Sequence, residues 1–144
     1  VLNKPYYRTA KILVASANFG CGSSREAAVY VLYDFGIRCV IASSFGDIHY
    51  GNELQNGMLP VVLPDEACAI LRAQLHARPG AQITVDLAAQ TVSGPDGTTY
   101  PFDIDPGHKE RLLKGLDDIG LVMQHEKEIE AFEARHRQAM PWLA

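Results

Sequence analysis

Short apolar segments alternate with amphipathic ones through the first part of the chain. Residues 11–16 (KILVAS) and 38–42 (RCVIA) are short and mostly apolar, which predicts two buried strands. Between them, apolar residues recur at helical spacing from Ala27 to Phe35, and Gly36 suits the left-handed position after a helix end. A strand, a helix and a strand within about 32 residues predict a βαβ unit with parallel strands and a right-handed crossover.

The middle of the chain predicts one more buried strand and then a different kind of sheet. Residues 58–63 (MLPVVL) form an apolar run, and residues 65–76 have the apolar spacing of a helix. Residues 82–87 and 90–93 instead alternate between apolar and polar positions, and Pro-Asp-Gly at 95–97 marks a tight turn. These patterns predict an antiparallel meander, and hence an α/β fold with mixed parallel and antiparallel strands.

The remaining segments have weaker patterns. Residues 43–57 are a long polar connection, for which we expect about one and a half helical turns. Residues 109–116 predict a short helix, and residues 117–121 predict a turn that leads into a short apolar stretch. Residues 126–137 predict a charged helix with a solvated face, whose isoleucine and phenylalanine pack inward.

Composition and charge narrow the classes of protein. The chain has 144 residues, which suits one domain with its own core. Its net charge is −4 and its basic residues form no block, so we expect no nucleic-acid partner. No apolar run approaches the roughly 20 residues that span a bilayer, so we expect no membrane partner. Cys21, Cys39 and Cys68 are far apart in the sequence, which argues against a disulfide framework or a metal site in this chain alone, and for the reducing cytoplasm.

Small and reactive residues gather between the first strand and the first helix, in residues 18–26 (NFGCGSSRE). Ser23 and Glu26 have the spacing of a capping box, which would start the helix here. A helix N-terminus attracts anions, and Arg25 in the first turn adds a planar guanidinium that suits a carboxylate. Glycines allow close approach to the backbone, and the hydroxyls of Ser23 and Ser24 can donate a hydrogen bond or move a proton. The segment predicts a carboxylate or phosphate site with a candidate acid/base serine.

Nucleotide-binding and hydrolase motifs do not match this segment. In a Gly-x-Gly-x-x-Gly motif that starts at Gly20, the third glycine would fall at position 25, which is arginine. The lysine of a phosphate loop is absent, and the residues from Gly22 to Arg25 do not fit a nucleophile elbow. Local chemistry alone leaves a simpler interpretation open, in which the helix is well capped and Arg25 is a surface residue.

A series of stretches carries a family resemblance: NFGCGSSRE, DFGIRCVIASSFGDI, NGMLPVVL, TVDLAAQTV, PDG, YPFDIDP and LLKGLDDIGL. In this order they closely resemble the small-subunit family of 3-isopropylmalate dehydratase, in the aconitase superfamily, over nearly the whole chain. The resemblance implies a swivelling domain with three layers, β/β/α, of the type of aconitase domain 4. It also implies that residues 1–144 are a single such domain that lacks the family's N-terminal segment, which holds an Asp-Thr-Asp sequence, and thus form an incomplete half of the active site.

The same resemblance implies a hydro-lyase that is active only with a large subunit, in a heterodimer or a higher hetero-oligomer. The large subunit would carry a [4Fe–4S] cluster, so this chain would bind no metal or cofactor itself. The complex would take a small dicarboxylate substrate in the cytoplasm. It would interconvert 2-isopropylmalate and 3-isopropylmalate in leucine biosynthesis, by removing water and adding it back at the neighbouring carbon.

The resemblance also implies roles for the residues of the turn. Ser23 would be the base that takes the substrate proton, as an alkoxide held by nearby N–H groups. Ser24 and Arg25 would bind a substrate carboxylate, with Gly22 beside them. Two further residues are candidates for lining the site, Cys21 and His49; their simpler interpretations are a small side chain that fills space and a histidine on a loop.

The resemblance leaves the identity of the substrate open. Ala27 stands where the family usually has a histidine, and residues 49–55 and 107–111 depart from the family's isopropylmalate-type sequences. These departures leave two alternatives to isopropylmalate: another substituted malate, such as a methylmalate or dimethylmalate, or a carboxylate-binding module without catalysis.

Overall fold

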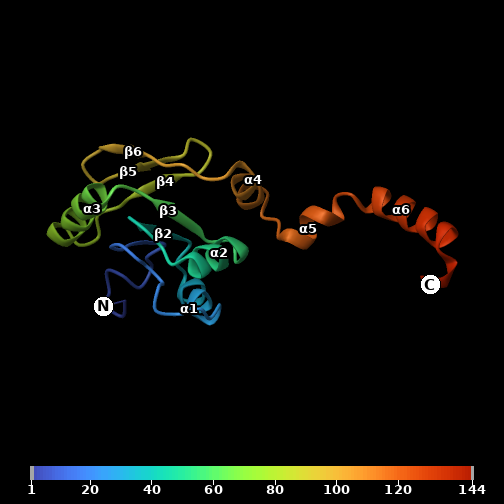
Figure 1. The fold of residues 1–144 in the computed structure, drawn as a ribbon. Coiled ribbons are helices and arrows are strands. Elements are labelled where there is room, and N and C mark those ends of the chain that lie inside the picture. The colour runs from blue at the N-terminus through green and yellow to red at the C-terminus, as the bar shows by residue number, and fades with distance from the viewer. Residues whose placement is uncertain (1, 144) are drawn as a thin grey trace.

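Two small β-sheets and a layer of helices make up the body of the molecule (Figure 1). The structure is a computed structural model that describes residues 2–143, apart from the side chains of residues 118 and 143. A parallel sheet of three strands lies between an antiparallel sheet of three strands and the helices α1 (Ala27–Phe35) and α2 (Asp47–Gln55). The predicted fold class, a β/β/α arrangement with mixed strands, is confirmed.

The first βαβ unit forms as its sequence pattern predicts. β1 (Ile12–Val14) and β2 (Cys39–Ala42) are parallel neighbours that α1 connects, with Leu13 opposite Val40. Gly36 ends α1 at a φ of 110°, and its N–H donates to carbonyl oxygens of the last helical turn. A left-handed residue is tolerated best as glycine, which explains why the helix stops here.

The parallel sheet is completed by β3 (Leu59–Val62), which pairs with β2 and gives the strand order β1-β2-β3. The predicted helix after it is confirmed as α3 (Asp65–Ala77). The prediction for residues 43–57 was wrong in extent, because α2 occupies nine of them as one regular helix. His49 and Glu53 are among the buried residues of α2, so its inner face is partly polar and does not show in a hydrophobic pattern.

The antiparallel meander is confirmed as β4 (Thr84–Asp86), β5 (Thr91–Ser93) and β6 (Thr99–Pro101), in that order. The tight turn before β6 also forms at the predicted place. Asp96 accepts a hydrogen bond from the N–H of Thr98 at 3.0 Å, as is typical of aspartate in turns.

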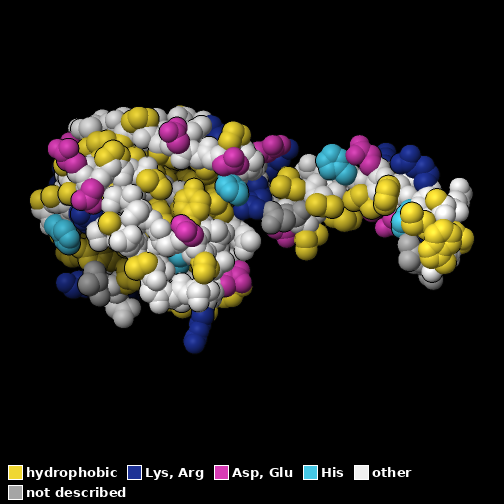
Figure 2. Space-filling view, viewed as in Figure 1, with side chains coloured by type: hydrophobic (Ala, Val, Ile, Leu, Met, Phe, Trp, Pro, Cys, Tyr) yellow, Lys and Arg dark blue, Asp and Glu magenta, His cyan; other side chains and the backbone are white. Residues whose placement is uncertain are grey.

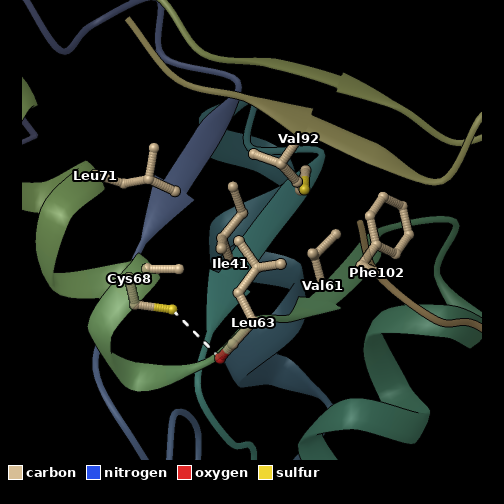
Figure 3. Packing of buried hydrophobic residues seen from close by; sticks show 9 residues of the cluster. Ile41, Val61, Leu63, Cys68, Leu71, Val92 and Phe102 are labelled. Atoms are coloured by element: carbon tan, nitrogen blue, oxygen red, sulfur yellow. Dashed lines mark hydrogen bonds between the residues drawn. The ribbon is translucent and has the colours of Figure 1, made fainter. Parts of the chain in front are cut away.

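Side chains that alternate along β2 contribute to two cores on opposite faces of the parallel sheet. Cys39 and Ile41 face the antiparallel sheet and α3, whereas Val40 packs with α1. The first core, between the two sheets and α3, contains Cys39, Ile41, Val61, Leu63, Ala67, Cys68, Leu71, Val92 and Phe102 (Figure 3). The second contains Val29, Ile37, Val40 and Met58. One strand thus ties both sheets and the helical layer together.

The first two helices after the meander both differ from the sequence prediction. α4 (Pro106–Lys114) begins before residue 109 because Asp105 caps it: its carboxylate accepts hydrogen bonds from two N–H groups of the first turn, and proline follows at the first helical position. The predicted turn at 117–121 is instead the start of α5 (Asp118–Met123), where Asp117 accepts from the N–H of Gly120 at 2.6 Å. A short helix that begins with an aspartate cap is easily mistaken for a turn in the sequence, since aspartate favours both helix N-caps and turns.

The chain ends in an arm that extends away from the sheets (Figure 1). It consists of α5, α6 (Glu126–Ala139) and a short 3₁₀ helix, Pro141–Leu143. The predicted charged helix is confirmed, but its inward packing was wrong: no described residue of α6 is buried, and Phe132 is 58% exposed. No helix among the described residues has both the length and the apolar character needed to cross a membrane.

Candidate active site

The Gly-Ser-Ser-Arg turn lies at the carboxyl ends of β1 and β2, where two loops meet. The loop after β1 is held to the loop after β2 by a short parallel bridge between Phe19 and Phe45. The N–H of Phe19 donates to the carbonyl oxygen of Ser44 at 2.9 Å, and the N–H of Gly46 donates back to Phe19 at 2.8 Å. Ligand sites of open α/β sheets commonly lie at this edge, outside the carboxyl ends of parallel strands.

Left-handed residues shape the turn itself. Asn18 has a φ of 57° and Gly20 a φ of 75°. The N–H of Cys21 donates to the carbonyl oxygen of Asn18 at 3.2 Å, and that of Ser23 donates to Gly20 at 3.4 Å. Gly20 therefore determines directly where the backbone of Ser23 lies.

The capping box predicted for Ser23 and Glu26 does not form. α1 begins at Ala27, and Glu26 lies at its N-cap without a side-chain cap bond, so Arg25 precedes the helix rather than lying in its first turn. The hydroxyl oxygen of Ser23 accepts from the N–H of Arg25 at 3.1 Å, which forms a local turn. The carboxylate of Glu26 accepts from Asn56 of the loop after α2 at 2.9 Å. A tertiary contact therefore takes the glutamate away from the helix end.

The turn presents polar groups at the surface. Gly22, Ser24 and Arg25 are exposed, and Ser23 is half-buried. A Cβ added to Gly22 would meet nothing within 4 Å, so the space above this glycine is open. The residues predicted to bind a carboxylate are thus contiguous and accessible.

The simpler interpretation of Cys21, a small side chain that fills space, was wrong, because Cys21 is exposed. Its backbone is what packs closely. A Cβ on Gly46 would lie 3.0 Å from the Cα of Cys21, so glycine at position 46 lets the two loops approach each other.

His49 lies beneath the turn, on α2 rather than on a loop, and is only 3% exposed. A Cβ on Gly20 would lie 2.1 Å from the Cγ of His49, so the imidazole packs directly against the glycine backbone. Its ring also meets the ring of Phe19 edge-on at 5.2 Å between centroids. The structure therefore brings His49 to the inner side of the turn, away from solvent.

Glu53 is a residue of this region that the sequence analysis missed. It is fully buried, and its Oε1 lies 3.0 Å from the Nε2 of His49 one helical turn earlier. Burial raises the pKa of Glu53 to about 8 and lowers the pKa of His49. The available signal was the spacing of a histidine and a glutamate four residues apart in a predicted helical stretch.

A hollow of about 340 Å³ lies at the carboxyl ends of β2 and β3, on the loop that is bridged to the loop after β1. Ser44, one of its lining residues, accepts a hydrogen bond from the N–H of Asn18 at 2.8 Å, which links the hollow to the turn. The lining residues are Ser43, Ser44, Phe45, Asp47, Tyr50 and Val62. The hollow therefore carries hydroxyl and carboxyl groups close to Asn18, at the start of the segment that contains the turn.

The cysteines of this chain do not fit the ligand set of an iron–sulfur cluster, which needs three or four thiolates together. Cys39 and Cys68 are buried in the core between the sheets, and Cys21 is exposed on the turn. Within residues 2–143, excepting the two side chains that are not described, no group of three His, Cys, Asp or Glu residues could hold a metal ion.

Comparison with known proteins gives consistent matches along the chain. Residues 1–66 match the model of the aconitase C-terminal domain, residues 69–106 match the LeuD_N model, and residues 118–144 match the C-terminal domain of the 3-isopropylmalate dehydratase small subunit. The small subunits of 3-isopropylmalate dehydratase from Paramagnetospirillum magneticum and Parvibaculum lavamentivorans are each 55% identical over 143 residues, which cover 99% of this chain and 71% of each relative. A crystal structure of 3-isopropylmalate dehydratase from Methanocaldococcus jannaschii matches with a TM-score of 0.62 and 27% identity, over 85% of this chain and 68% of that one.

Proposed function

The chain belongs to the family of 3-isopropylmalate dehydratase small subunits, and we propose that its exposed turn supplies the base and the carboxylate-binding groups of that reaction. As a hydro-lyase subunit, the chain acts in leucine biosynthesis, where 2-isopropylmalate and 3-isopropylmalate are interconverted by loss and return of water. The relatives favour this substrate over the other substituted malates. One observation carries the residue assignment: Gly22, Ser23, Ser24 and Arg25 are contiguous at the carboxyl ends of two parallel strands, and three of the four are exposed.

The proposed roles follow from the charge of the substrate. An isopropylmalate is a dianion, and removing a proton from the carbon beside a carboxylate builds more negative charge on that carboxylate. The guanidinium of Arg25 and the hydroxyl of Ser24 bind it and stabilise this charge. The oxygen of Ser23 accepts the proton. Because a serine is a weak base at its usual pKa, this step depends on a positive local field from Arg25 and backbone N–H groups.

Cys21 and Gly22 have lesser roles than the two serines and the arginine. Cys21 precedes Gly22 on the exposed side of the turn, and we propose that its thiol lines the site without moving a proton. The open space above Gly22 leaves room for the substrate to approach the backbone.

Activity with a large subunit tests this function. We expect the chain, mixed with a large subunit of the same family, to convert 3-isopropylmalate to the alkene intermediate, which is followed by its absorbance. The chain alone is expected to show no turnover. Binding between the subunits without turnover of any branched malate would overturn the assignment.

Replacing Arg25 with lysine should weaken substrate binding more than catalysis. An ammonium group cannot make the two parallel hydrogen bonds of a guanidinium, so we expect KM to rise about tenfold while kcat changes little. Arg78→Lys, at the end of α3, is the matched control and should leave both constants unchanged. Equal kinetics for Arg25→Lys and wild type would remove Arg25 from the carboxylate site.

We propose that the arm formed by α5 and α6 binds the large subunit, which carries the [4Fe–4S] cluster in a heterodimer or higher hetero-oligomer. Large apolar side chains are exposed along the arm, where Figure 2 shows them as a row that ends in a broad patch. They are Ile119, Val122, Met123, Phe132, Met140 and Trp142, with Trp142 74% exposed. Exposed apolar surface of this extent is typical of protein interfaces.

Removing two aromatic side chains of the arm tests this interface. We expect Phe132→Ala/Trp142→Ala to weaken association with the large subunit by about 30-fold or more, because buried aromatic residues dominate interface energies. The melting temperature of the isolated chain should not change, since both side chains are exposed. Glu130→Ala on α6 is the control. Unchanged affinity in the double variant would show that the arm does not form the interface.

We further propose that the two sheets and their helices form one swivelling domain and that the chain acts in the cytoplasm. The shared strand β2, which contributes to both cores, supports the first statement. Three free cysteines, Cys21, Cys39 and Cys68, are consistent with a reducing compartment.

A further inference from the structure

We propose that His49 and Glu53 are positioning residues: a buried acid–imidazole pair that holds the backbone of Gly20, and through it Ser23, in the geometry for proton transfer. This inference rests on the proposed role of Ser23. Neither side chain touches the exposed surface on which the substrate would bind, so both act through the turn.

The pair is enclosed within the protein. His49 is 3% exposed and Glu53 is 0% exposed, and 3.0 Å separates their Nε2 and Oε1 atoms. Among the described residues, none of the four polar side-chain atoms of the pair, Nδ1 and Nε2 of His49 and Oε1 and Oε2 of Glu53, has a partner in hydrogen-bond geometry. Burying polar groups in this way is costly, and removing one partner of such a pair leaves the other uncompensated. A fold has little reason to keep this arrangement under a surface turn unless the pair has a task there.

A continuous set of contacts leads from the pair to the candidate base. The imidazole of His49 lies so close to Gly20 that a Cβ there would be 2.1 Å from its Cγ. The carbonyl oxygen of Gly20 accepts the N–H of Ser23 at 3.4 Å. Any rotation of the imidazole would therefore displace Gly20 and shift the hydroxyl of Ser23. The carboxyl of Glu53 limits that rotation because its Oε1 lies only 3.0 Å from Nε2 of the ring.

The pair is also suited to its place because it is neutral near pH 7. Burial raises the pKa of Glu53 to about 8 and lowers the pKa of His49, so the carboxyl keeps its proton and the imidazole is uncharged. Two acidic groups that interact with Glu53, the thiol of Cys39 and the hydroxyl of Tyr50, stay protonated at this pH. The thiol of Cys39 has a pKa raised to about 12 by burial and by Glu53, and burial, Asp105 and Glu53 raise the pKa of the Tyr50 hydroxyl.

Neutrality beneath the turn favours the proposed chemistry. A buried carboxylate here would oppose both the alkoxide form of Ser23 and the substrate dianion, because charges interact strongly in a desolvated site. Ionisation of Glu53, as the pH rises through about 8, would place such a charge under Gly20. A comparison of the wild type with a Glu53 variant isolates the effect of this charge.

The test compares three variants in complex with a large subunit, with kcat and KM measured for 3-isopropylmalate. We expect Glu53→Ala to lower kcat on the order of 10- to 100-fold at nearly constant KM, because the proton acceptor is displaced while the carboxylate contacts remain. Glu53→Gln keeps the shape of the side chain and a neutral polar group beside Nε2 of His49, so it should recover most of the rate. The double variant His49→Phe/Glu53→Leu keeps a ring against Gly20 and leaves no buried polar group, so it should recover more of kcat than Glu53→Ala does.

The pH profile of kcat gives a readout that a purely structural role would not change. In the wild type we expect kcat to fall as the pH rises through about 8, and in Glu53→Gln this fall should be absent. Glu66→Ala, an exposed glutamate on α3, should behave as wild type throughout. If Glu53→Ala does not fold, the Glu53→Gln profile decides alone.

The inference is overturned if Glu53→Gln retains the same alkaline fall, or if folded Glu53→Ala changes KM and leaves kcat intact. Failure of the proposed function has a different outcome. In that case the wild-type complex itself would not turn over 3-isopropylmalate, or Ser23→Ala would retain full activity.

Discussion

Ser23→Ala abolishes turnover in the complex: we expect kcat on 3-isopropylmalate to fall by about 10³-fold or more, within the range that general acid–base groups contribute. The alanine variant has no atom that can accept the proton in this position. KM and association with the large subunit should stay close to wild type, since Ser24, Arg25 and the arm are unaltered. Single-turnover measurement of alkene formation would separate the chemical step from product release.

The matched control for this variant is Ser93→Ala. Ser93 lies on β5 in the antiparallel sheet, where its hydroxyl is 3.3 Å from that of Thr99, and it is remote in the fold from the turn. Its removal should leave kcat and KM unchanged. Activity of Ser23→Ala equal to that of the control would exclude Ser23 as the base.

Gly20→Ala should destabilise the isolated chain by about 3 kcal/mol and inactivate the complex. Two independent reasons add here. The φ of 75° at position 20 disfavours any side chain, and the new Cβ would lie 2.1 Å from the Cγ of a buried histidine. The measurement is urea unfolding followed by far-UV circular dichroism, together with turnover in the complex.

Gly22→Ala is the control for that experiment, two residues along the same turn. Gly22 does not have a positive φ, and a Cβ there meets nothing within 4 Å. Its stability should therefore stay within about 1 kcal/mol of wild type, although activity can fall if the methyl group meets the substrate. Equal stability of the Gly20 and Gly22 variants would contradict the packing of His49 against the turn.

Much of the fold follows from patterns that a reader can find in the sequence. The spacing of apolar residues identifies the βαβ unit, the third apolar strand, α3 and the meander. The residues of the turn could also be found this way, because Ser23, Ser24 and Arg25 are adjacent and their chemistry is local. The sequence did not show that α1 starts only after these residues. Glu26 bonds to Asn56 instead of capping the helix, and these two residues are 30 positions apart in the chain.

The spacing of apolar residues misjudged the burial of two helices in opposite directions. α2 was underestimated because its inward face carries His49 and Glu53, and a hydrophobic pattern treats such residues as exposed. The presence of Ile129 and Phe132 predicts inward packing of α6, but none of its described residues is buried, and the helix extends away from the sheets (Figure 1). Periodicity identifies a face of a helix; it does not say what covers that face.

The sequence by itself predicted the α/β class, the three parallel strands, the meander, and the helices α1 and α3, and it placed Gly22, Ser23, Ser24 and Arg25 next to one another. These depend on residues within a few positions of one another, whose spacing and propensities are local properties. Only the tertiary structure decided that a polar pair on α2 lies beneath that turn, that Cys21 is exposed, and that the last helices form an arm. Each of these depends on which distant segments exclude water from one another, and that is settled when the sheets and helices pack.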